Sequence, residues 1–451
     1  MEHGYEGAHF SRGEDGYEEA RRQAVWNART PARFPAEIVI AEGQSDVIRA
    51  VKSAAENDYR IGVRSGGHSW AGNHVREGGL LLDVSRMRAT DVQAQAMTAT
   101  VGPGCLGNEL LAELARDDLF FPAGHCPGVA LGGYLLQGGY GWNGRVHGPA
   151  CMSVEAIDVV KADGSLVHAD CEQNSDLLWA ARGAGPGFFG VVTRFYLRLQ
   201  RRPQVVANAV YLYPVDVLDE VFAWAHAIGP LVARTMELML IVHRLDDGEL
   251  EIAVTGPVLV DSEQEAAQAL AVLQSCPAIG RAKLAEPHIP VSLADLYAGV
   301  HVAYPDEHRY GTDNMWTHAP IEKLLPGLHR IAETMPPAPS HMLWMNWAPG
   351  ATPAPARPPM AYSVEDDTYI AVYGVWLDQA QDEANTAWAT ERMRELEPHA
   401  SGIQLADENL GRRPARFVSA ENLTRLDELR AIHDPQGRFH PWMGRPDPPP
   451  R

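Results

Sequence analysis

The sequence predicts an α+β fold organised in two regions, and three observations support this. Strand and helix patterns alternate from about residue 36 to Arg201-Arg202-Pro203, where the first region ends. Strand patterns restart after residue 204 and lead into acidic helix patterns. The chain has 451 residues, of which 45% are hydrophobic. Because single cores stop growing at roughly 250–300 residues, we expect about two or three domains.

Local signals predict the elements of the first region. Ser45 can cap a helix through residues 47–56, and residues 61–64 form a strand pattern that enters a glycine-rich loop. Residues 1–19 are polar and glycine-rich, so we expect a flexible lead. The other expected elements are strands at 80–84, 97–101 and 191–199, a helix at 106–116, and a hairpin of 154–161 with 166–169.

The second region is predicted to contain a series of strands followed by helices. The expected elements are strands at 205–211, 236–242 and 250–258, a turn at Asp246-Asp247-Gly248, and a helix at 262–274. Residues 368–376 alternate as a strand, which places Tyr369, Ala371, Tyr373 and Val375 on one face. Two proline-rich segments are predicted to be irregular, a surface loop at 353–359 and a loose tail at 445–451.

Composition limits the partners that we expect. The formal net charge is −20, which disfavours binding to nucleic acid and to anionic membranes. No apolar run approaches the roughly 20 residues that cross a bilayer, and the N-terminus lacks the apolar core of a signal peptide. Five cysteines are a sparse, odd set, typical of a reducing compartment, so we expect a cytoplasmic protein.

Two glycine-rich turns each carry a reactive side chain. Residues 64–69 read Arg-Ser-Gly-Gly-His-Ser, and residues 122–126 read Pro-Ala-Gly-His-Cys. Glycines at this density let the backbone approach a flat or anionic ligand, and let N–H groups converge on a phosphate. A nucleotide loop alone needs neither the imidazole of His68 nor the thiol of Cys126.

These loops resemble the berberine-bridge-enzyme-like branch of the vanillyl-alcohol-oxidase superfamily, whose members are FAD-linked oxidases. The resemblance covers residues of about 20–200 and about 420–443 well, and the middle of the chain only in layout. It rests on four segments: Arg64-Ser-Gly-Gly-His68-Ser-Trp-Ala-Gly72, Phe121-Pro-Ala-Gly-His-Cys126-Pro-Gly-Val-Ala-Leu-Gly-Gly133, Arg182-Gly-Ala-Gly-Pro-Gly-Phe-Phe-Gly-Val-Val-Thr193, and Asn422-Leu-Thr-Arg-Leu followed by Asp434-Pro and Phe439.

The resemblance implies the domain layout and the cofactor. It implies an FAD-binding domain at 1–203, a substrate domain at 204–400 on an antiparallel sheet covered by helices, and a segment 401–451 that returns to the first domain. It implies FAD bonded covalently to both His68 and Cys126. The other implied FAD contacts are Arg64, Ser65, Gly66, Gly67, Ser69, Gly132, Gly133, Gly138, Gly190, Val192, Asn422 and Phe439.

Other interpretations of the same residues are weaker. His68 could be a structural turn histidine, and Cys126 an inert buried thiol. Gly67-His-Ser-Trp-Ala71 departs from a hydrolase nucleophile elbow at Ala71, and a strand follows it instead of a helix. Residues 183–188 fail the dinucleotide fingerprint and precede a strand. We find no spacing of His and Cys that predicts a metal site.

The implied chemistry is oxidation of a small molecule. In the resembling family, flavin N5 takes hydride from a carbon that bears a hydroxyl or amine, or from a benzylic carbon. A base removes the partner proton. Molecular oxygen then reoxidises the flavin and yields hydrogen peroxide. The residue three positions after the linking Cys gates oxygen in the family. A Val there accompanies oxidases, and here it is Val129.

The catalytic base is the main departure from the family pattern. Many members have Tyr after the Asn of the C-terminal segment, where this chain has Leu423. Candidate replacements are Tyr134, Tyr310 and Tyr373, each of which is equally consistent with a packing role. Tyr has an ordinary pKa of about 10, so a neighbouring cation or the flavin would have to assist it. His308 and Arg309 are possible helpers of Tyr310.

The middle of the chain is expected to line the substrate pocket. Trp344 and Asn346 alternate on one face of 342–347, and Tyr310, Asn314 and Trp316 form an aromatic, polar stretch. Such groups suit a sugar or an aromatic secondary metabolite. Besides an oxidase, the sequence leaves open a flavin dehydrogenase with another acceptor, a redox-neutral flavin-bound cyclase and a non-catalytic flavin-binding protein.

Overall fold

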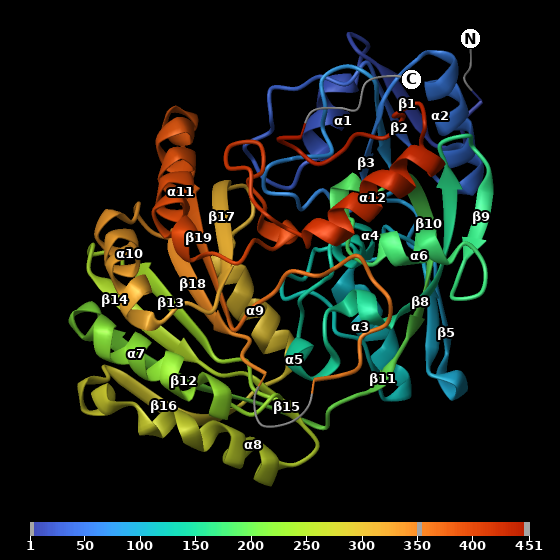
Figure 1. Ribbon diagram of the computed structural model, residues 1–451. Coiled ribbons are helices and arrows are strands. Elements are labelled where there is room, and N and C mark those ends of the chain that lie inside the picture. The colour runs from blue at the N-terminus through green and yellow to red at the C-terminus, as the bar shows by residue number, and fades with distance from the viewer. Residues whose placement is uncertain (1–3, 350–353, 446–451) are drawn as a thin grey trace.

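The computed structural model describes residues 4–349 and 354–445 as three main sheets with their covering helices (Figure 1). The first sheet has the order β1-β2-β4-β3, in which β2, β4 and β3 run parallel and β1 is antiparallel. Its strands are β1 Ala8–Ser11, β2 Glu37–Ile40, β3 Ile61–Arg64 and β4 Leu80–Asp83. Helix α2, Gln44–Glu56, buries Val47, Ala50 and Val51 against this sheet, because these residues recur at the helical period.

The second sheet is antiparallel and has the order β5-β6-β10-β8-β9. Its strands are β5 Thr90–Gln93, β6 Thr98–Val101, β8 Val154–Lys161, β9 Leu166–Ala169 and β10 Gly190–Arg198. The remaining regular elements of this half are α1 Tyr17–Gln23, α3 Gly107–Leu114, α4 Leu131–Leu136, α5 Gly144–His147, α6 Ser175–Ala181 and the pair β7 Leu119–Phe120 with β11 Gln200–Arg201.

The third sheet is antiparallel and is built entirely from the middle of the chain. Its order is β15-β12-β14-β13-β18-β19-β17, and β16 also pairs with β12. Its strands are β12 Val205–Pro214, β13 Met239–Arg244, β14 Leu250–Thr255, β15 Val258–Val260, β16 Leu284–Pro290, β17 Arg309–Thr317, β18 His341–Asn346 and β19 Thr368–Trp376.

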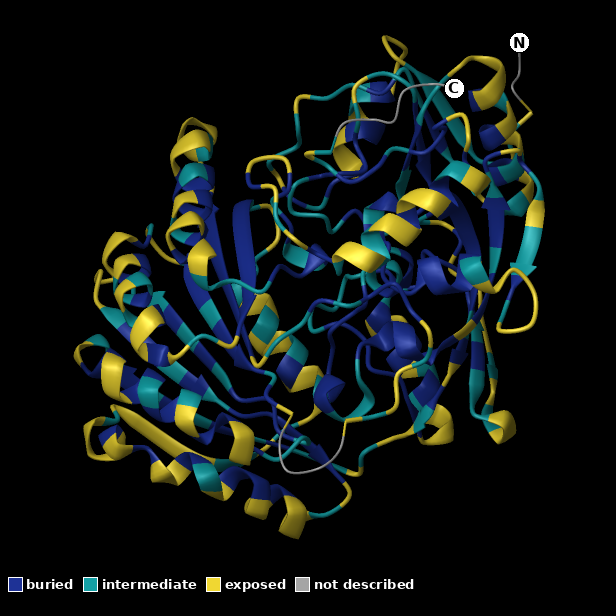
Figure 2. Cartoon of the chain, in the orientation of Figure 1, coloured by how far each residue is buried: buried dark blue, intermediate teal, exposed yellow. Residues whose placement is uncertain are grey.

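Helices cover one face of the third sheet and leave the other face toward the first half of the chain (Figure 1). The covering helices are α7 Leu218–Ile228, α8 Glu263–Leu270, α10 Ile321–Thr334 and α11 Asp382–Leu396. Strands β17 and β19 are buried along almost their whole length, whereas β12 and β13 alternate between buried and intermediate residues and the edge strand β16 is largely exposed (Figure 2). The outer sides of the helices are exposed. Helix α9, Leu293–Ala303, lies on the opposite side, between the sheet and the first half.

The end of the chain returns to the first half. Helix α12, Ala420–His433, lies across it, and Phe439 bridges in parallel to Ile61 on β3. Trp442 is buried and donates its indole N–H to the carbonyl of Ala184 at 2.7 Å. The C-terminal segment therefore completes the core around β3, the strand that leads into the first glycine-rich loop.

The α+β class predicted from the sequence is confirmed, and several element boundaries were wrong. Ser45 does not cap α2, because the helix begins at Gln44 with Gly43 as its N-cap. The strand expected at 250–258 is split into β14 and β15, since Gly256-Pro257 interrupts the ladder. The helix expected at 262–274 starts after its cap Ser262 but ends at Leu270. The domain boundaries at 203 and 400 stay a prediction, and part of the loop expected at 353–359 lies outside the described residues.

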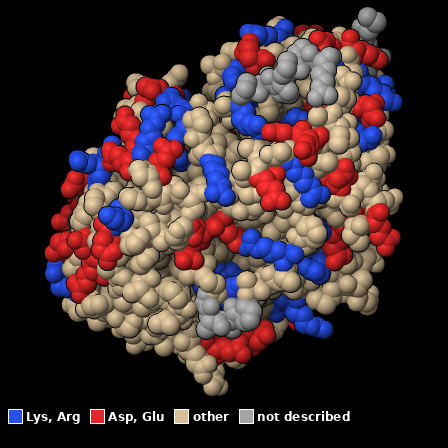
Figure 3. All heavy atoms as spheres, viewed as in Figure 1, with Lys and Arg blue, Asp and Glu red and all other residues tan. Residues whose placement is uncertain are grey.

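Two surface features complete the description. Acidic and basic side chains are interspersed on the face shown in Figure 3, over both halves of the molecule. Within residues 4–349 and 354–445, no helix has both the length and the apolar character needed to cross a bilayer.

Candidate active site

One cavity of about 590 Å³ connects the first half of the molecule to the open face of the third sheet. At one end it is lined by Ile61, Val192 and Phe439, and at the other by Met345 and Tyr373. Its wall includes the loop after β3. Ligands of open α/β sheets bind beyond the carboxyl ends of parallel strands, so this is where a nucleotide cofactor is expected.

Most of the predicted site residues line this cavity. They are Arg64, Ser65, Gly66, Gly67, His68, Ser69, Cys126, Val129, Gly132, Gly133, Tyr134, Gly190, Val192, Tyr373 and Phe439. Three predicted residues are not among its lining residues. Gly138 packs on the ring of Tyr362, Asn422 donates its amide to the carbonyl of Ala361 at 2.9 Å, and the Tyr310 hydroxyl donates to the carbonyl of Pro305.

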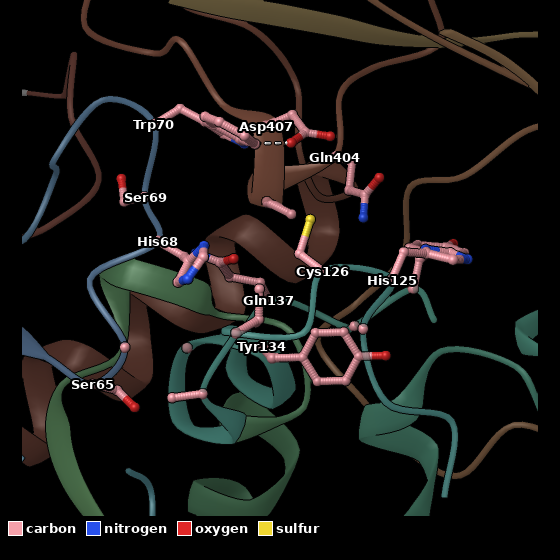
Figure 4. Close-up of a pocket in the computed structure, with 18 of the residues that line it drawn as sticks. Ser65, His68, Ser69, Trp70, His125, Cys126, Tyr134, Gln137, Gln404 and Asp407 are labelled. Carbon is pink, nitrogen blue, oxygen red and sulfur yellow. Dashed lines mark hydrogen bonds between the residues drawn. The ribbon is translucent and has the colours of Figure 1, made fainter. Parts of the chain in front are cut away.

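His68 and Cys126 lie close together between the two glycine-rich loops (Figure 4). The ring of His68 stacks on Trp26 with centroids 4.9 Å apart. Burial, with a smaller contribution from Arg64, lowers the pKa of His68 to about 4, so the imidazole is neutral at pH 7. Burial, with a smaller contribution from the charge of Asp407, raises the pKa of Cys126 to about 12. Both side chains also line a second cavity of about 630 Å³.

The first loop has features that fit the pyrophosphate and flavin of FAD. The Arg64 guanidinium is held by Asp83 at 2.8 and 3.0 Å. Its buried Nε has no hydrogen-bond partner among the residues that the structure describes and can donate to an anionic ligand. A Cβ on Gly66 would lie 2.9 Å from Ala130, and one on Gly132 would lie 2.7 Å from the Ser65 hydroxyl. The two loops therefore touch, and only glycine permits this approach.

Asp407 accepts three hydrogen bonds at the other end of the cavity. Trp70 Nε1 donates to Oδ1 at 2.6 Å (Figure 4). Tyr373 donates to Oδ2 at 3.1 Å, and the Tyr369 hydroxyl also donates to Oδ2. Burial raises the pKa of Asp407, and the three donors oppose this rise. Sequence reasoning missed this residue, because the only signal was the acidic pair Asp407-Glu408 in a stretch that matched no motif.

A second carboxylate pairs with the residue that precedes Cys126. Glu237 Oε2 lies 2.8 Å from His125 Nε2, and Glu237 Oε1 accepts the backbone N–H of Asn143 at 2.7 Å. Glu237 is buried, and His125 lines the cavity with its ring edge-on to Trp142. This contact joins the second glycine-rich loop to the start of the third sheet.

The three tyrosines proposed as bases have different surroundings. Tyr134 donates its hydroxyl to the carbonyl of Pro122 at 2.5 Å, and burial raises its pKa well above the ordinary value. Burial also raises the pKa of Tyr310, and its expected helper Arg309 is paired with Asp382 at 2.6 Å. Only Tyr373 both lines the cavity and contacts a carboxylate.

The prediction that Trp344 and Asn346 line the pocket was wrong. Both are buried on the face of β18 that packs under the helices, with Trp344 in the core formed with α7 and α10. Because side chains alternate along a strand, their neighbours His341, Leu343 and Met345 face the cavity instead. The pattern predicted the strand, but it could not show which face the helices would cover.

Known proteins are similar to this chain in both sequence and fold. A family model described as FAD binding domain matches residues 35–170. The chain is 32% identical to FAD-linked oxidoreductase nodO of Hypoxylon pulicicidum over 428 residues, which are 94% of each protein. It is 29% identical to (R)-6-hydroxynicotine oxidase of Paenarthrobacter nicotinovorans over 223 residues, which are 49% of this chain and 46% of the relative. Among solved structures, 6-hydroxy-D-nicotine oxidase of Arthrobacter nicotinovorans aligns over 98% of both chains with a TM-score of 0.85 at 21% identity, and BBE-like 1 of Physcomitrella patens aligns over 98% of this chain and 97% of that one with a TM-score of 0.83 at 20% identity.

The full-length match to nodO, the FAD-binding family model and the shared fold agree with the loops around His68 and Cys126. The chain therefore belongs to the family of FAD-linked oxidoreductases that includes nodO, and it has the fold of BBE-like 1 and of 6-hydroxy-D-nicotine oxidase.

Proposed function

We propose that this enzyme is an FAD-dependent oxidase that removes hydride from an alcohol, amine or benzylic carbon of a small molecule and passes the electrons to molecular oxygen, forming hydrogen peroxide. The observation that carries this proposal is the common cavity of His68, Cys126 and the Asp407 cluster. Bound FAD supplies the hydride acceptor, while the residues described here hold the cofactor, orient the substrate and take its proton.

We propose that His68 and Cys126 each form a covalent bond to FAD. The pKa of about 4 leaves the His68 imidazole with a free lone pair at neutral pH, so it could bond to a methyl carbon of bound FAD. The C–H bond lost there would give its proton to a base and its two electrons to the flavin, which oxygen would then reoxidise. Cys126 is a thiol in its present surroundings, because its pKa is near 12. Its bond to the flavin therefore requires that a base take the thiol proton while the cofactor binds.

Asp407 is the proposed proton acceptor, acting through Tyr373. A substrate hydroxyl that donates to the Tyr373 oxygen would pass its proton to Tyr373 as Tyr373 passes its own to Asp407 Oδ2, so the net change is the transfer of one proton from the substrate to Asp407. The raised pKa of Asp407 favours this transfer relative to an exposed carboxylate. The hydroxyls of Tyr134 and Tyr310 are engaged by backbone carbonyls, which makes them weaker candidates.

The walls of the cavity support a neutral or cationic substrate. In the part of the chain that the structure describes, none of the lining residues from the third sheet, α9 or 404–407 is Lys or Arg. Met239, Ile241, Leu343 and Tyr304 add apolar and aromatic surface there. A sugar or an aromatic secondary metabolite can stack on such walls, whereas an anion would meet the charge of Asp407 without a counter-ion.

Val129 supports oxygen as the electron acceptor. It lines the cavity, and its N–H lies 3.4 Å from the carbonyl oxygen of Cys126, so its position depends on the loop that carries the thiol. Among solved structures of this fold, a grass-pollen protein changed from asparagine to histidine is named a glucose dehydrogenase, whereas the variant that also carries an isoleucine-to-valine change is named a glucose oxidase. We assign the corresponding role to Val129.

The test is a screen of oxygen consumption and peroxide formation by the purified enzyme over sugars, benzylic alcohols and cyclic amines. Peroxide formed in proportion to the oxygen consumed supports the oxidase. A substrate that bleaches the flavin without air, but gives no peroxide in air, would instead indicate a dehydrogenase with another acceptor. A substrate that is converted without oxygen uptake and without bleaching would indicate a redox-neutral cyclase.

A further inference from the structure

Asn314 lies beneath the cavity wall without being one of the residues that line it. It is fully buried on β17 and stands opposite Ala371 in the ladder with β19. Since directly paired residues share a face, Asn314 is on the same side of the sheet as Tyr369 and Tyr373, the two tyrosines that contact Asp407.

The side chain of Asn314 binds both ends of the turn that presents Asp407. Its Oδ1 accepts the backbone N–H of Gln404 at 2.8 Å. Its Nδ2 donates to the carbonyl of Gln404 at 3.1 Å and to the carbonyl of Asp407 at 2.8 Å. One buried amide therefore fixes the backbone immediately before the turn Leu405–Asp407 and at its last residue.

The residues around Asn314 hold it in place. Arg413 donates to both carboxylate oxygens of Asp313 at 2.5 and 2.9 Å, and to the carbonyl of Asn314 at 2.8 Å. Asn409 adds a hydrogen bond to Asp313 at 3.0 Å. Strand β17 thus makes hydrogen bonds to the segment 404–413 both before and after Asp407.

The same segment also contacts the loop that carries His68. Asp407 accepts from Trp70, and the next residue, Glu408, accepts from the side chain of Asn73 at 3.1 Å. Trp70 and Asn73 come shortly after His68 in the same loop. The position of the Asp407 turn is therefore fixed from the sheet by Asn314 and from the cofactor loop by Trp70 and Asn73.

We propose that Asn314 is a positioning residue that sets the Asp407 carboxylate against Tyr373 and toward the reacting edge of the flavin. The inference rests on the proposed role of Asp407 as proton acceptor. Without the amide, the turn loses three hydrogen bonds and the carboxylate moves away from the cavity, although every group that touches the substrate is still present.

The experiment uses the FAD-loaded enzyme and sodium sulfite, an anion that adds to many oxidised flavins and bleaches their visible absorbance. A carboxylate near the flavin edge repels sulfite, so Asp407→Asn should tighten sulfite binding by about tenfold. Asn314→Leu should also tighten sulfite binding. The double variant should bind sulfite no more tightly than Asp407→Asn alone, because Asn314→Leu acts by displacing the charge that Asp407→Asn removes.

Asn346→Leu is the matched control. Asn346 is also a buried amide in this sheet, and it holds another loop through Gly229 and Ala348 on the opposite face. The Asn346→Leu variant should lower the melting temperature about as much as Asn314→Leu does, and it should leave sulfite binding at the wild-type value. Asn314→Ala, a smaller neutral change that also removes the three hydrogen bonds to Gln404 and Asp407, serves if Asn314→Leu does not fold, and it should also tighten sulfite binding.

Hydrogen exchange of the peptide 403–409 gives a readout that needs no sulfite. Asn314→Leu should accelerate exchange there and Asn346→Leu should not, and equal exchange in both variants would overturn the proposal. Wild-type sulfite binding in Asn314→Leu, with altered binding in Asp407→Asn, would also overturn it. Unaltered binding in Asp407→Asn, in an enzyme that does bind sulfite, would count against the role of Asp407 itself and so against both proposals.

Discussion

Trp70 donates its indole N–H to the carboxylate of Asp407 at 2.6 Å, although the two residues are 337 positions apart in the chain. The contact joins the loop of His68 to the segment that returns from the third sheet. A substrate held between them meets the cofactor loop on one side and a buried carboxylate on the other. The proposed proton acceptor is therefore linked by a hydrogen bond to the loop that carries His68.

The first prediction concerns Asp407→Asn. Asparagine keeps the shape of the side chain but cannot take a proton at neutral pH, and a positioned general base contributes roughly 10²–10⁴ in rate. We expect anaerobic flavin reduction by the substrate found in the oxygen screen to slow by about that factor in stopped-flow measurements. Asp306→Asn is the control, because Asp306 also accepts an indole hydrogen bond, from Trp26 at 2.9 Å, but is exposed. Equal loss in both variants would contradict the assignment.

The second prediction concerns pH. Asp407 acts as a base only when it is ionised, and burial raises its pKa above the ordinary value. The rate of flavin reduction should therefore fall as the pH is lowered through this raised pKa, and should recover as the pH rises. In Asp407→Asn this limb should disappear, which a pH series of stopped-flow reductions will measure. If the loss of rate at low pH persists unchanged in Asp407→Asn, it is caused by the titration of another ionisable group.

The third prediction concerns cofactor attachment. If both covalent bonds form, the wild type should stay yellow after acid precipitation, and His68→Ala and Cys126→Ala should each retain FAD through the remaining bond. Only the double variant should release FAD into the supernatant. Cys151→Ala is the control, since Cys151 is buried outside both cavities and should not affect retention. Free FAD in the wild-type supernatant would refute covalent linkage.

The sequence predicted the cofactor end of the site better than the substrate end. His68 and Cys126 lie in long contiguous motifs, so the residues next to each in the sequence were enough to single out both loops. Asp407 acquires its role only through Trp70, Tyr369 and Tyr373, which reach it from a distant loop and from β19. No periodicity or local motif records such contacts. Leu423, which suggested a missing base, lies on α12, where it is partly buried against the core and does not line the cavity.

The fourth prediction concerns stability. Arg413 and Asp313 form a pair in which both side chains are almost fully buried, 4% and 1% exposed. Arg413→Met leaves the Asp313 carboxylate buried without its cation, and breaking such a pair typically costs about 3–5 kcal/mol. Arg412→Met is the control, because Arg412 pairs with the exposed Glu383, and surface pairs are worth about 0–1 kcal/mol. Denaturant unfolding of both variants measures the difference, and equal midpoints would contradict the role of the buried pair.

The fifth prediction concerns oxygen. Val129 lines the cavity beside the loop of Cys126, and Val129→Leu adds one methylene to that wall. Overpacking a close-packed wall typically costs about 1–3 kcal/mol. A comparable penalty on the approach of oxygen, at about 1.4 kcal/mol per tenfold in rate, would slow reoxidation roughly tenfold or more. Reduction by substrate should change little, because Asp407, Tyr373 and the sheet face are untouched. Stopped-flow measurement of the two half-reactions separates these effects within one variant. Equal reoxidation rates in the wild type and in Val129→Leu would remove Val129 from the oxygen path, and with it the main residue-level support for an oxidase over a dehydrogenase.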